Sequence, residues 1–372
     1  MKYCIKCILP NTRPNLTLNS DGLCNACETH SKKKEIDWKN REGMLLKIIK
    51  NAKHRSNGYD CVIPVSGGKD STWQVLKCLE YGLNPLAVTW KTPSRTKIGT
   101  KNLENLISLG VDHIDYQINP KIERRFLYSA LEKFGSTGIP MHMAIFNIPL
   151  KIAFNFNIPL IVWGENSAHE YGGTKKQQND FHLNKSWFEK FGVTHGTTAH
   201  DWVSSNLTKK NLEAYFSPSF NDLKEKKILS IFLGHFLPWD PKISFSIASR
   251  NGFKERKKGA KTGFYKYADI DDDFISIHHY LKWYKFGFSR IFDNLSIEIR
   301  NGRISREEAL EIIKDKGDFT PHDDIEKFCK FLNISTKNFF RIIEKFRNLK
   351  IWEKHNNVWQ IKNFIIDDWE WK

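Results

Sequence analysis

The sequence predicts an α/β fold in which a parallel sheet carries helices on both faces, with a cysteine-rich segment before it and a mainly helical region after it. Three observations predict this fold. Apolar runs alternate with helical patterns from residue 61 to residue 163, four cysteines form two close pairs near the amino terminus, and helical patterns dominate after residue 270. Alternating strands and helices with right-handed crossovers produce parallel strands. A chain of 372 residues can form two or three domains, which we expect at residues 1–35, 36–240 and 241–372.

The amino-terminal segment carries two C-x2-C pairs, Cys4 with Cys7 and Cys24 with Cys27. Each pair can lie on a tight turn with both thiolates facing one ion, which suits tetrahedral zinc. The segment has few apolar residues, so we expect the metal to define its fold. We predict a structural Cys4 zinc knuckle without a catalytic role, because a closed shell leaves no open coordination position. An iron–sulfur cluster and a redox dithiol are the alternatives.

A helix near residues 38–55 and a buried strand over residues 62–65 come next. The strand runs into Ser66-Gly67-Gly68-Lys69-Asp70-Ser71, after which the apolar spacing predicts a helix that ends at Gly82. Paired glycines allow a tight turn and a close approach of the backbone to a ligand. The unpaired N–H groups and the positive dipole end of such a helix form an anion site.

This loop lacks Walker A spacing, which places four residues between its first glycine and a Gly-Lys-Ser/Thr ending. It matches instead the pyrophosphate loop, or PP-loop, of ATP-consuming enzymes that release AMP and pyrophosphate. An ordinary strand–turn–helix junction is the structural alternative. The predicted fold is thus a PP-loop (adenine nucleotide alpha hydrolase-like) fold, and the loop residues predicted to bind ATP are Ser66, Gly67, Gly68, Lys69, Asp70 and Ser71.

The remaining elements of the sheet follow in order along the chain. We expect strands at 84–90, 112–118, 158–163 and near 231–240, with helices at 101–109 and 121–156. Ligands of parallel sheets bind beyond the carboxyl ends of the strands. Thr89, Trp90 and Gly164 lie at such ends, so we predict that they complete the ATP site.

The segment after the fourth strand, Gly164 to Gly173, combines carboxylates, an amide and a phenol with three glycines. For Glu165 we consider a magnesium ligand at the ATP phosphates, a hydrogen-bond acceptor for nucleotide or substrate, and a solvated loop carboxylate. Its position favours function. Asn166, Glu170 and Tyr171 are candidates for substrate contact.

The region after residue 240 is basic and predominantly helical. Residues 250–266 are dense in Lys and Arg, which fits either an anion-binding loop or a solvated surface. Asp271 to Asp273 are expected to begin a helix through its dipole, and the adjacent His278 and His279 to be structural. Ser305 with Glu308 predicts a capping box. Further helices over 328–346 and a hairpin over 351–361 are expected.

Composition limits the cellular setting and the partners. The formal net charge of +16 suits nucleic acid, a membrane surface or anionic small molecules, and it does not choose among them. We expect no membrane span, because the sequence has no run of 18 or more apolar residues. The amino terminus lacks a signal-peptide core, and the odd number of seven cysteines favours a reducing compartment. We therefore expect a cytoplasmic protein.

Taken together, the paired cysteines, the PP-loop, the Gly164-Glu165-Asn166 and Glu170-Tyr171-Gly172-Gly173 motifs and the block from His279 to Arg306 resemble the N-acetyl sugar amidotransferase family. The resemblance covers nearly the whole chain. Members resemble pseudaminic acid and lipopolysaccharide O-antigen enzymes that convert a sugar acetamido group to an acetamidino group. The resemblance implies that Lys285, Arg290 and Arg300 bind the substrate's carboxylate or phosphate. It also implies a separate class I glutaminase that supplies ammonia, with a synthase-like companion subunit.

The chemistry supports this assignment. An amide is a poor electrophile, and attack of its oxygen on the α-phosphate of ATP would activate it for ammonia. We expect Lys69 to neutralise the departing pyrophosphate, Asp70 to orient a metal-bound water or the loop, and Glu165 to act at the reacting centre, with ATP and Mg²⁺ as cofactors besides the structural Zn²⁺. The sequence carries no catalytic cysteine directly after Met1 and no Gly-x-Cys-x-Gly elbow, so the ammonia is expected from outside.

The main alternative is a PP-loop enzyme that modifies tRNA, a thiolase or a lysidine-type ligase. It would explain the charge and the zinc module. Thiolation would require reactive cysteines near the loop, whereas Cys61 and Cys78 lie in a predicted buried strand and helix face. A zinc-bearing nucleic-acid binding protein with a vestigial ATP site is a third interpretation, which the intact PP-loop disfavours. We do not expect nucleic acid as the partner.

Overall fold

The computed structural model describes residues 1–317 and 319–371, and a five-stranded parallel sheet lies at its centre. The strands are β1 (Cys61–Pro64), β2 (Pro85–Trp90), β3 (Asp112–Tyr116), β4 (Leu160–Trp163) and β5 (Leu229–Phe232). Their order is β3-β2-β1-β4-β5, and every neighbouring pair is parallel. The chain therefore leaves β1 first toward β2 and later toward β4, so the carboxyl ends of β1 and β4 form the switch point where such sheets bind ligands.

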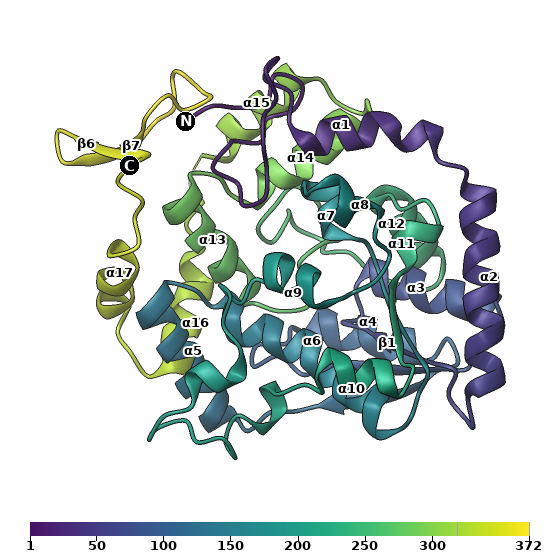
Figure 1. The fold of residues 1–372 in the computed structure, drawn as a ribbon. Helices are drawn as coiled ribbons and strands as arrows, with labels where there is room; N and C mark the ends of the chain where they lie inside the picture. The colour runs from purple at the N-terminus through teal and green to yellow at the C-terminus, as the bar shows by residue number, and fades with distance from the viewer. Residues whose placement is uncertain (318, 372) are drawn as a thin grey trace.

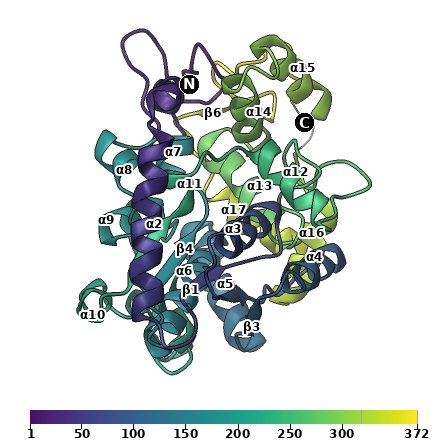
Figure 2. The ribbon, with the colours of Figure 1, turned by 90° about the vertical axis from the view of Figure 1, so that its right-hand side faces the viewer.

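Helices cover both faces of this sheet, as the sequence predicts (Figure 1, Figure 2). On β1, Val62 packs into the core beneath α5 (Pro120–Phe134) and α6 (Gly138–Asn155), whereas Ile63 packs into the core on the opposite face. That second core contains residues of α2 (Trp38–Arg55), α3 (Lys69–Glu80) and α4 (Lys97–Ile107). Alternate burial on the two faces is what a fully covered parallel strand requires. The predicted α/β class is confirmed.

Several boundaries differ from the sequence-based expectation. The last strand, expected near 231–240, is β5 at Leu229–Phe232, and a short helix follows it. The helical section expected over 121–156 consists of two helices, α5 and α6, because the backbone at Gly135 is left-handed (φ 54°) and ends α5. The third strand ends at Tyr116 rather than at residue 118. Between β4 and β5 the chain forms only short helices. They are α7 (Ser167–Tyr171), α8 (Lys175–Asn179), α9 (Lys185–Phe191), η2 (Ala199–Trp202), η3 (Glu213–Tyr215) and α10 (Phe220–Glu225).

The carboxyl-terminal region is mainly helical, as expected. After β5 come α11 (Leu233–Phe236), α12 (Pro241–Arg250), α13 (Ile275–Phe286), α14 (Arg290–Arg300), α15 (Arg306–Lys316), α16 (His322–Leu332) and α17 (Thr336–Glu344), then the antiparallel hairpin β6 (Trp352–His355) and β7 (Val358–Ile361). The predicted capping box begins α15, where the Glu308 backbone N–H donates to Ser305 Oγ and the Ser305 N–H donates to the Glu308 carboxylate.

The amino-terminal segment, with α1 (Asn25–Ser31) and the single turn η1 (Lys32–Glu35), lies against the carboxyl-terminal helices α14 and α15 (Figure 1). Its fully buried Ile8 and Leu9 share one hydrophobic core with Phe288, Ile291 and Leu295. Segments nearly 300 residues apart in sequence therefore stabilise each other. Within the described residues, no helix combines the length and apolar character that crossing a membrane would require.

Candidate active site

The PP-loop joins β1 to α3 and places its helix start at the switch point. Gly67 has a φ of 83°, and a Cβ on it would lie 2.6 Å from the Leu103 backbone nitrogen, so only glycine fits there. The hydroxyl of Ser71 donates to the Gly68 carbonyl at 3.0 Å, and the Gly68 N–H donates to Ser66 Oγ at 3.3 Å. These bonds hold the loop in shape, while the first N–H groups of α3 have no partner within the helix.

A cavity of about 450 Å³ opens at the carboxyl ends of β1, β2 and β4, and we call it the loop cavity. The predicted ATP-site and catalytic residues that line it are Ser66, Gly68, Lys69, Asp70, Ser71, Thr89, Trp90, Gly164 and Glu165. Gly67 is not part of the lining, because it packs against Leu103 behind the loop. The structure thus gathers residues from three strand ends around one space.

A second wall of the loop cavity comes from residues 267–272, which sequence reasoning did not assign to the site. Asp271 to Asp273 do not begin the helix, since α13 starts at Ile275. The Thr96 N–H donates to the Asp271 carbonyl at 2.9 Å and ties this segment to the start of α4. Burial raises the pKa of Asp272 to about 7. The sequence feature that could have indicated this wall is the run of three acidic residues that follows the basic, glycine-containing stretch 250–266.

Lys69 and Asp70 form an ion pair at the rim of the loop cavity. Only 6% of Lys69 is exposed, and its Nζ lies 5.8 Å from the ring centroid of Trp239 and 5.9 Å from that of Tyr267. The Trp239 indole donates to Asp70 Oδ1 at 3.0 Å and fixes that carboxylate. The ammonium is therefore partly shielded from water and faces the space in front of the helix start.

A second cavity of about 540 Å³ adjoins the first, and we call it the basic cavity. The residues that line both cavities are Met141, Ile145, Glu165, Ile275 and Arg290. Burial raises the pKa of Glu165 to about 7, and the charge of Asp70 adds to that shift. Glu165 is thus a carboxyl group that can exchange a proton near neutral pH at the boundary between the two spaces.

Cations of four separate segments line the basic cavity: Arg13, Lys190, Lys282, Lys285 and Arg290. Three of them surround Asp293, whose side chain is 1% exposed: Arg13 Nε and Lys282 Nζ each lie 2.8 Å from it, and Arg290 Nη1 lies 3.9 Å from it. Burial alone would raise the pKa of Asp293, but Lys282, Arg13 and Arg290 lower it far below its ordinary value. Arg290 also pairs with Asp269 through Nε at 3.0 Å, so these three cations share two carboxylates and one positive charge is left in excess.

Lys285 adds to that excess. Its Nζ donates to the Phe134 carbonyl at 2.9 Å, and no carboxylate pairs with it in the described part of the chain. Burial lowers its pKa to about 8. Burial also lowers the pKa of the lining His142 to about 4, so that ring is neutral at neutral pH. An anionic ligand would find uncompensated cations in this cavity.

Three of the predicted substrate residues lie outside both cavities. Asn166 caps α7 by accepting the Ala168 N–H at 2.9 Å, and Glu170 pairs with Lys33 at 2.8 Å. Arg300 donates from Nη2 to the Glu170 carbonyl at 3.0 Å. These residues hold the loop after β4, whereas Tyr171, Lys285 and Arg290 line the basic cavity.

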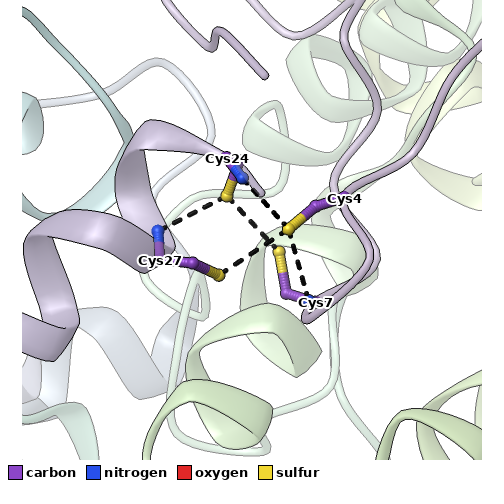
Figure 3. Close-up of side chains that lie close together, drawn as sticks. All are labelled: Cys4, Cys7, Cys24 and Cys27. Atoms are coloured by element: carbon purple, nitrogen blue, oxygen red, sulfur yellow. Dashed lines mark hydrogen bonds between the residues drawn. The ribbon is translucent and has the colours of Figure 1, made fainter. Parts of the chain in front are cut away.

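The four amino-terminal cysteines form one buried cluster (Figure 3). Their sulfurs all lie within 4.8 Å of one another, with 3.9 Å between Cys4 and Cys27 and 3.7 Å between Cys7 and Cys24. A tetrahedral ion with metal–sulfur bonds of about 2.3 Å requires sulfurs about 3.8 Å apart, so these residues fit a metal ion. The N–H groups of Cys7 and Cys24 point at Cys4 Sγ, at 3.5 and 3.3 Å. Such amides stabilise thiolates.

Comparisons with known proteins bear mainly on the carboxyl-terminal region. Residues 261–365 match the family described as "LPS biosynthesis protein WbpG-like, C-terminal domain". Among solved structures, NMN synthetase from Francisella tularensis is 14% identical, with a TM-score of 0.29 over 60% of this chain and 99% of its own. At that TM-score the likeness bears on neither fold nor reaction. Curated proteins gave no significant match. The region that supplies residues 267–272 and Arg290 to the two cavities is thus similar to lipopolysaccharide biosynthesis proteins.

Proposed function

We propose that this protein is an ATP-dependent N-acetyl sugar amidotransferase that converts the acetamido group of a bacterial surface-polysaccharide sugar to an acetamidino group. One observation carries the proposal: a cavity at the PP-loop and a basic cavity meet at Glu165 and Arg290. The first suits ATP and the second suits an anionic sugar, either nucleotide-linked or a nonulosonic acid. Their shared wall is where the α-phosphate and the acetamido group would meet. The similarity of residues 261–365 to lipopolysaccharide biosynthesis proteins supports the substrate class.

In the first step, the acetamido oxygen attacks the α-phosphorus of ATP. A new P–O bond forms, the bond to pyrophosphate breaks, and an O-adenylyl imidate results that keeps the hydrogen on the sugar's nitrogen and is therefore protonated. The helix start after Gly68 and the Ser66 and Ser71 hydroxyls hold the departing pyrophosphate, and Lys69 neutralises the charge that develops on it. For this, Lys69 must break its ion pair with Asp70. A bound phosphate would favour that exchange of partners, because a phosphate carries more negative charge than one carboxylate.

Magnesium fits the loop cavity because it prefers oxygen ligands and usually binds through one or two carboxylates together with substrate phosphates. Asp70 is the carboxylate that would hold it. When bound, magnesium would neutralise phosphate charge. Within the described residues the cysteine cluster is the only preformed group of three or more metal-binding side chains, so the phosphates would have to complete the magnesium site.

In the second step, ammonia adds to the imidate carbon, its nitrogen passes a proton to Glu165, and the C–O bond to AMP breaks. The product keeps the sugar's own nitrogen and gains an NH in place of the acetamido oxygen. A carboxyl group with a pKa of about 7 suits a proton acceptor at neutral pH. The ammonia comes from a separate class I glutaminase, with a synthase-like companion subunit. Zinc is the metal proposed for the cysteine cluster, with a structural role.

A tRNA thiolase is the main competing function, and the positions of the cysteines argue against it. Cys61 is fully buried and Cys78 is 2% exposed, both in the core beneath α3. Among the residues that the structure describes, which include all seven cysteines, no cysteine lines the loop cavity or the basic cavity. A sulfur-transferring enzyme of this kind needs a thiolate within reach of the activated base.

The test is to incubate the purified protein with ATP, magnesium, ammonium and a panel of acetamido sugars, and to follow nucleotides and sugar mass together. We expect AMP and pyrophosphate only with particular sugars, and a product in which NH replaces oxygen. AMP formation that ignores every sugar but responds to tRNA would overturn the proposal and favour the tRNA-modifying enzyme.

A further inference from the structure

We propose that the cysteine module, residues 1–35, is the positioning element for the loop Gly164–Gly173 and through it for the basic cavity. Arg13 and Arg300 are the positioning residues. The proposal rests on the proposed function only for the identity of the sugar ligand, because its central claim concerns which part of the molecule holds the loop. That claim rests on contacts among three segments far apart in sequence.

The module contacts the loop at several points along its length. Arg13 Nη1 donates to the Tyr171 carbonyl at 2.9 Å, and the guanidinium lies 5.1 Å from the centre of the Tyr171 ring. Lys33 pairs with the Glu170 carboxylate at 2.8 Å. A Cβ on Gly172, which has a φ of 103°, would lie 2.7 Å from Asn25 Oδ1. The backbone of the loop thus packs directly against the module, and the absence of a side chain at Gly172 permits this close contact.

Arg300 connects the same loop to the cysteine cluster from the other side. It is 7% exposed at the end of α14, and its Nη2 donates to the Glu170 carbonyl at 3.0 Å. Its Nη1 has no hydrogen-bond partner among the described residues, although it is buried. Burial lowers the pKa of Arg300, and the charges of the Cys7 and Cys27 thiolates more than offset this and raise it. Four thiolates around a divalent ion carry a net negative charge, which a buried guanidinium would balance.

Arg13 contacts both the loop Gly164–Gly173 and the wall of the basic cavity. It belongs to the segment between Cys7 and Cys24, so a metal ion would fix that segment at both ends. Its Nε donates to Asp293 Oδ1 at 2.8 Å, and Lys282 Nζ donates to the other oxygen, Oδ2, at 2.8 Å. Arg13, Pro14 and Asn15 form part of the cavity wall. One side chain of the module therefore touches both the loop after β4 and the buried carboxylate that organises the cations.

The PP-loop depends on a different part of the molecule. Its neighbours Ile63, Val65 and Trp73 belong to the core that α2, α3 and α4 form. That core contains no residue of the cysteine module; from the loop Gly164–Gly173 it contains Tyr171 alone. Loss of the metal should therefore release the loop Gly164–Gly173 and the basic cavity, and leave the helix start that would bind ATP phosphates in place.

Hydrogen exchange on the full-length protein tests this claim without any substrate. We compare the zinc-loaded protein with protein treated with a chelator under reducing conditions, and with Arg13→Ala in the zinc-loaded state. In both comparisons we expect at least tenfold faster exchange in peptides that cover 164–173 and 286–293, and unchanged exchange in peptides that cover 61–75. Lys6→Ala, which removes an exposed cation of the same module, is the matched control. Unchanged exchange at 164–173, or equal acceleration at 61–75, would overturn the proposal.

Steady-state kinetics give a second readout. For Arg13→Ala we expect a KM for the sugar raised at least tenfold and a KM for ATP within twofold of wild type. Arg13→Lys should recover little, because the single nitrogen of lysine lacks the planar fork with which Arg13 directs Nε–H at Asp293 and Nη1–H at the Tyr171 carbonyl. Full recovery by Lys would overturn the positioning role. If no acetamido sugar is turned over but the exchange result holds, the proposed function fails and this inference stands.

Discussion

Lys69 lies between a carboxylate and two aromatic rings, which makes its charge available only when another anion takes the place of Asp70. We predict that Lys69→Ala lowers kcat for sugar-dependent AMP formation by about 10²–10³-fold, the range seen when one preorganised electrostatic contact to developing charge is removed. Initial rates of AMP release measure this. The control is Lys77→Ala, which removes a half-buried lysine on the same helix that pairs with Glu80. Turnover of Lys69→Ala near the wild-type rate would contradict the assignment.

Glu165 makes the reaction pH-dependent. Because its pKa in the free protein is about 7, the carboxyl group is mostly protonated below pH 7 and can accept a proton only above it. We predict that kcat/KM for ammonia, calculated from the concentration of uncharged NH3, rises with pH through about 7 and then levels off, and that Glu165→Gln lowers the plateau and abolishes this rise. A Glu165→Gln variant with the wild-type pH profile would exclude Glu165 as the acceptor.

The raised pKa of Glu165 also makes the stability of the folded protein fall as pH rises. The folded protein binds the Glu165 proton more tightly than the unfolded chain, so the stabilising effect is fully present below the ordinary pKa of about 4.5 and is lost as pH rises to about 7. Glu165→Gln should therefore gain thermal stability relative to wild type between pH 5 and pH 8. Melting temperatures measured across that range test this, and a constant difference would contradict it.

Among single residues, those in local motifs were predictable and those contributed by distant segments were not. Ser66 to Ser71 follow one another along the chain, so one pattern predicts that they lie together. Arg13 and Lys282 reach the basic cavity only because α14 and the cysteine module pack together. Arg300 illustrates the same point. The family resemblance of the block from His279 to Arg306 predicted that Arg300 binds substrate, but its side chain donates to the Glu170 carbonyl outside both cavities.

At the scale of elements, the start of α3 depends on the glycine at position 67. We predict that Gly67→Ala weakens ATP binding at least tenfold and destabilises the fold by about 1–3 kcal/mol, because alanine at a φ of 83° is strained and its Cβ would meet the Leu103 backbone. Nucleotide titration and chemical denaturation measure the two effects. Gly58→Ala is the control, since its Cβ would meet nothing within 4 Å and its φ is not positive. Equal behaviour of the two variants would contradict the role of Gly67.

The elements also show where a sequence pattern misleads. Apolar runs predicted β1, β2, β4 and β5, because a strand covered on both faces is apolar throughout. The edge strand β3 is partly polar and was predicted from the alternation of strands and helices. Asp271 to Asp273 were expected to begin a helix, but the local backbone instead pairs with the chain before α4 through the contacts of Thr96 and Arg95. Those partners lie more than 170 residues away in sequence, so no local rule could place this segment on the wall of the loop cavity.

On the scale of the whole molecule, three regions meet at one place: the sheet supplies the PP-loop, the carboxyl-terminal helices supply most of the cations, and the cysteine module supplies Arg13. The sheet was predictable because each strand and helix carries its own periodic signal. The basic cavity was not, since it exists only where α13, α14 and the module pack beside the carboxyl end of β4. Side chains of the cysteine module and of the carboxyl-terminal helices share one core, which joins segments separated by most of the chain.

The distribution of cysteines over the whole chain leads to the last prediction, which concerns the nitrogen donor. A class I glutaminase uses a cysteine nucleophile. Each of the seven cysteines of this chain is buried at a position that does not suit a nucleophile. Four form the buried cluster, while Cys61, Cys78 and Cys329 lie in hydrophobic cores. A hydrogen bond with Cys78 and burial raise the pKa of Cys61 well above its ordinary value, and burial raises the pKa of Cys329 to about 11. Thiols of this kind are inert.

We therefore predict that ammonium supports turnover by the purified protein and that glutamine alone gives less than 1% of that rate. Addition of a class I glutaminase that recognises this protein should make glutamine as effective as ammonium. AMP release with each nitrogen source measures the difference, and Cys329→Ser provides a control that should change neither rate. Glutamine-dependent turnover by the chain alone, at a rate close to that with ammonium, would show that a nucleophile for glutamine lies within this protein and that the division of labour proposed for it is wrong.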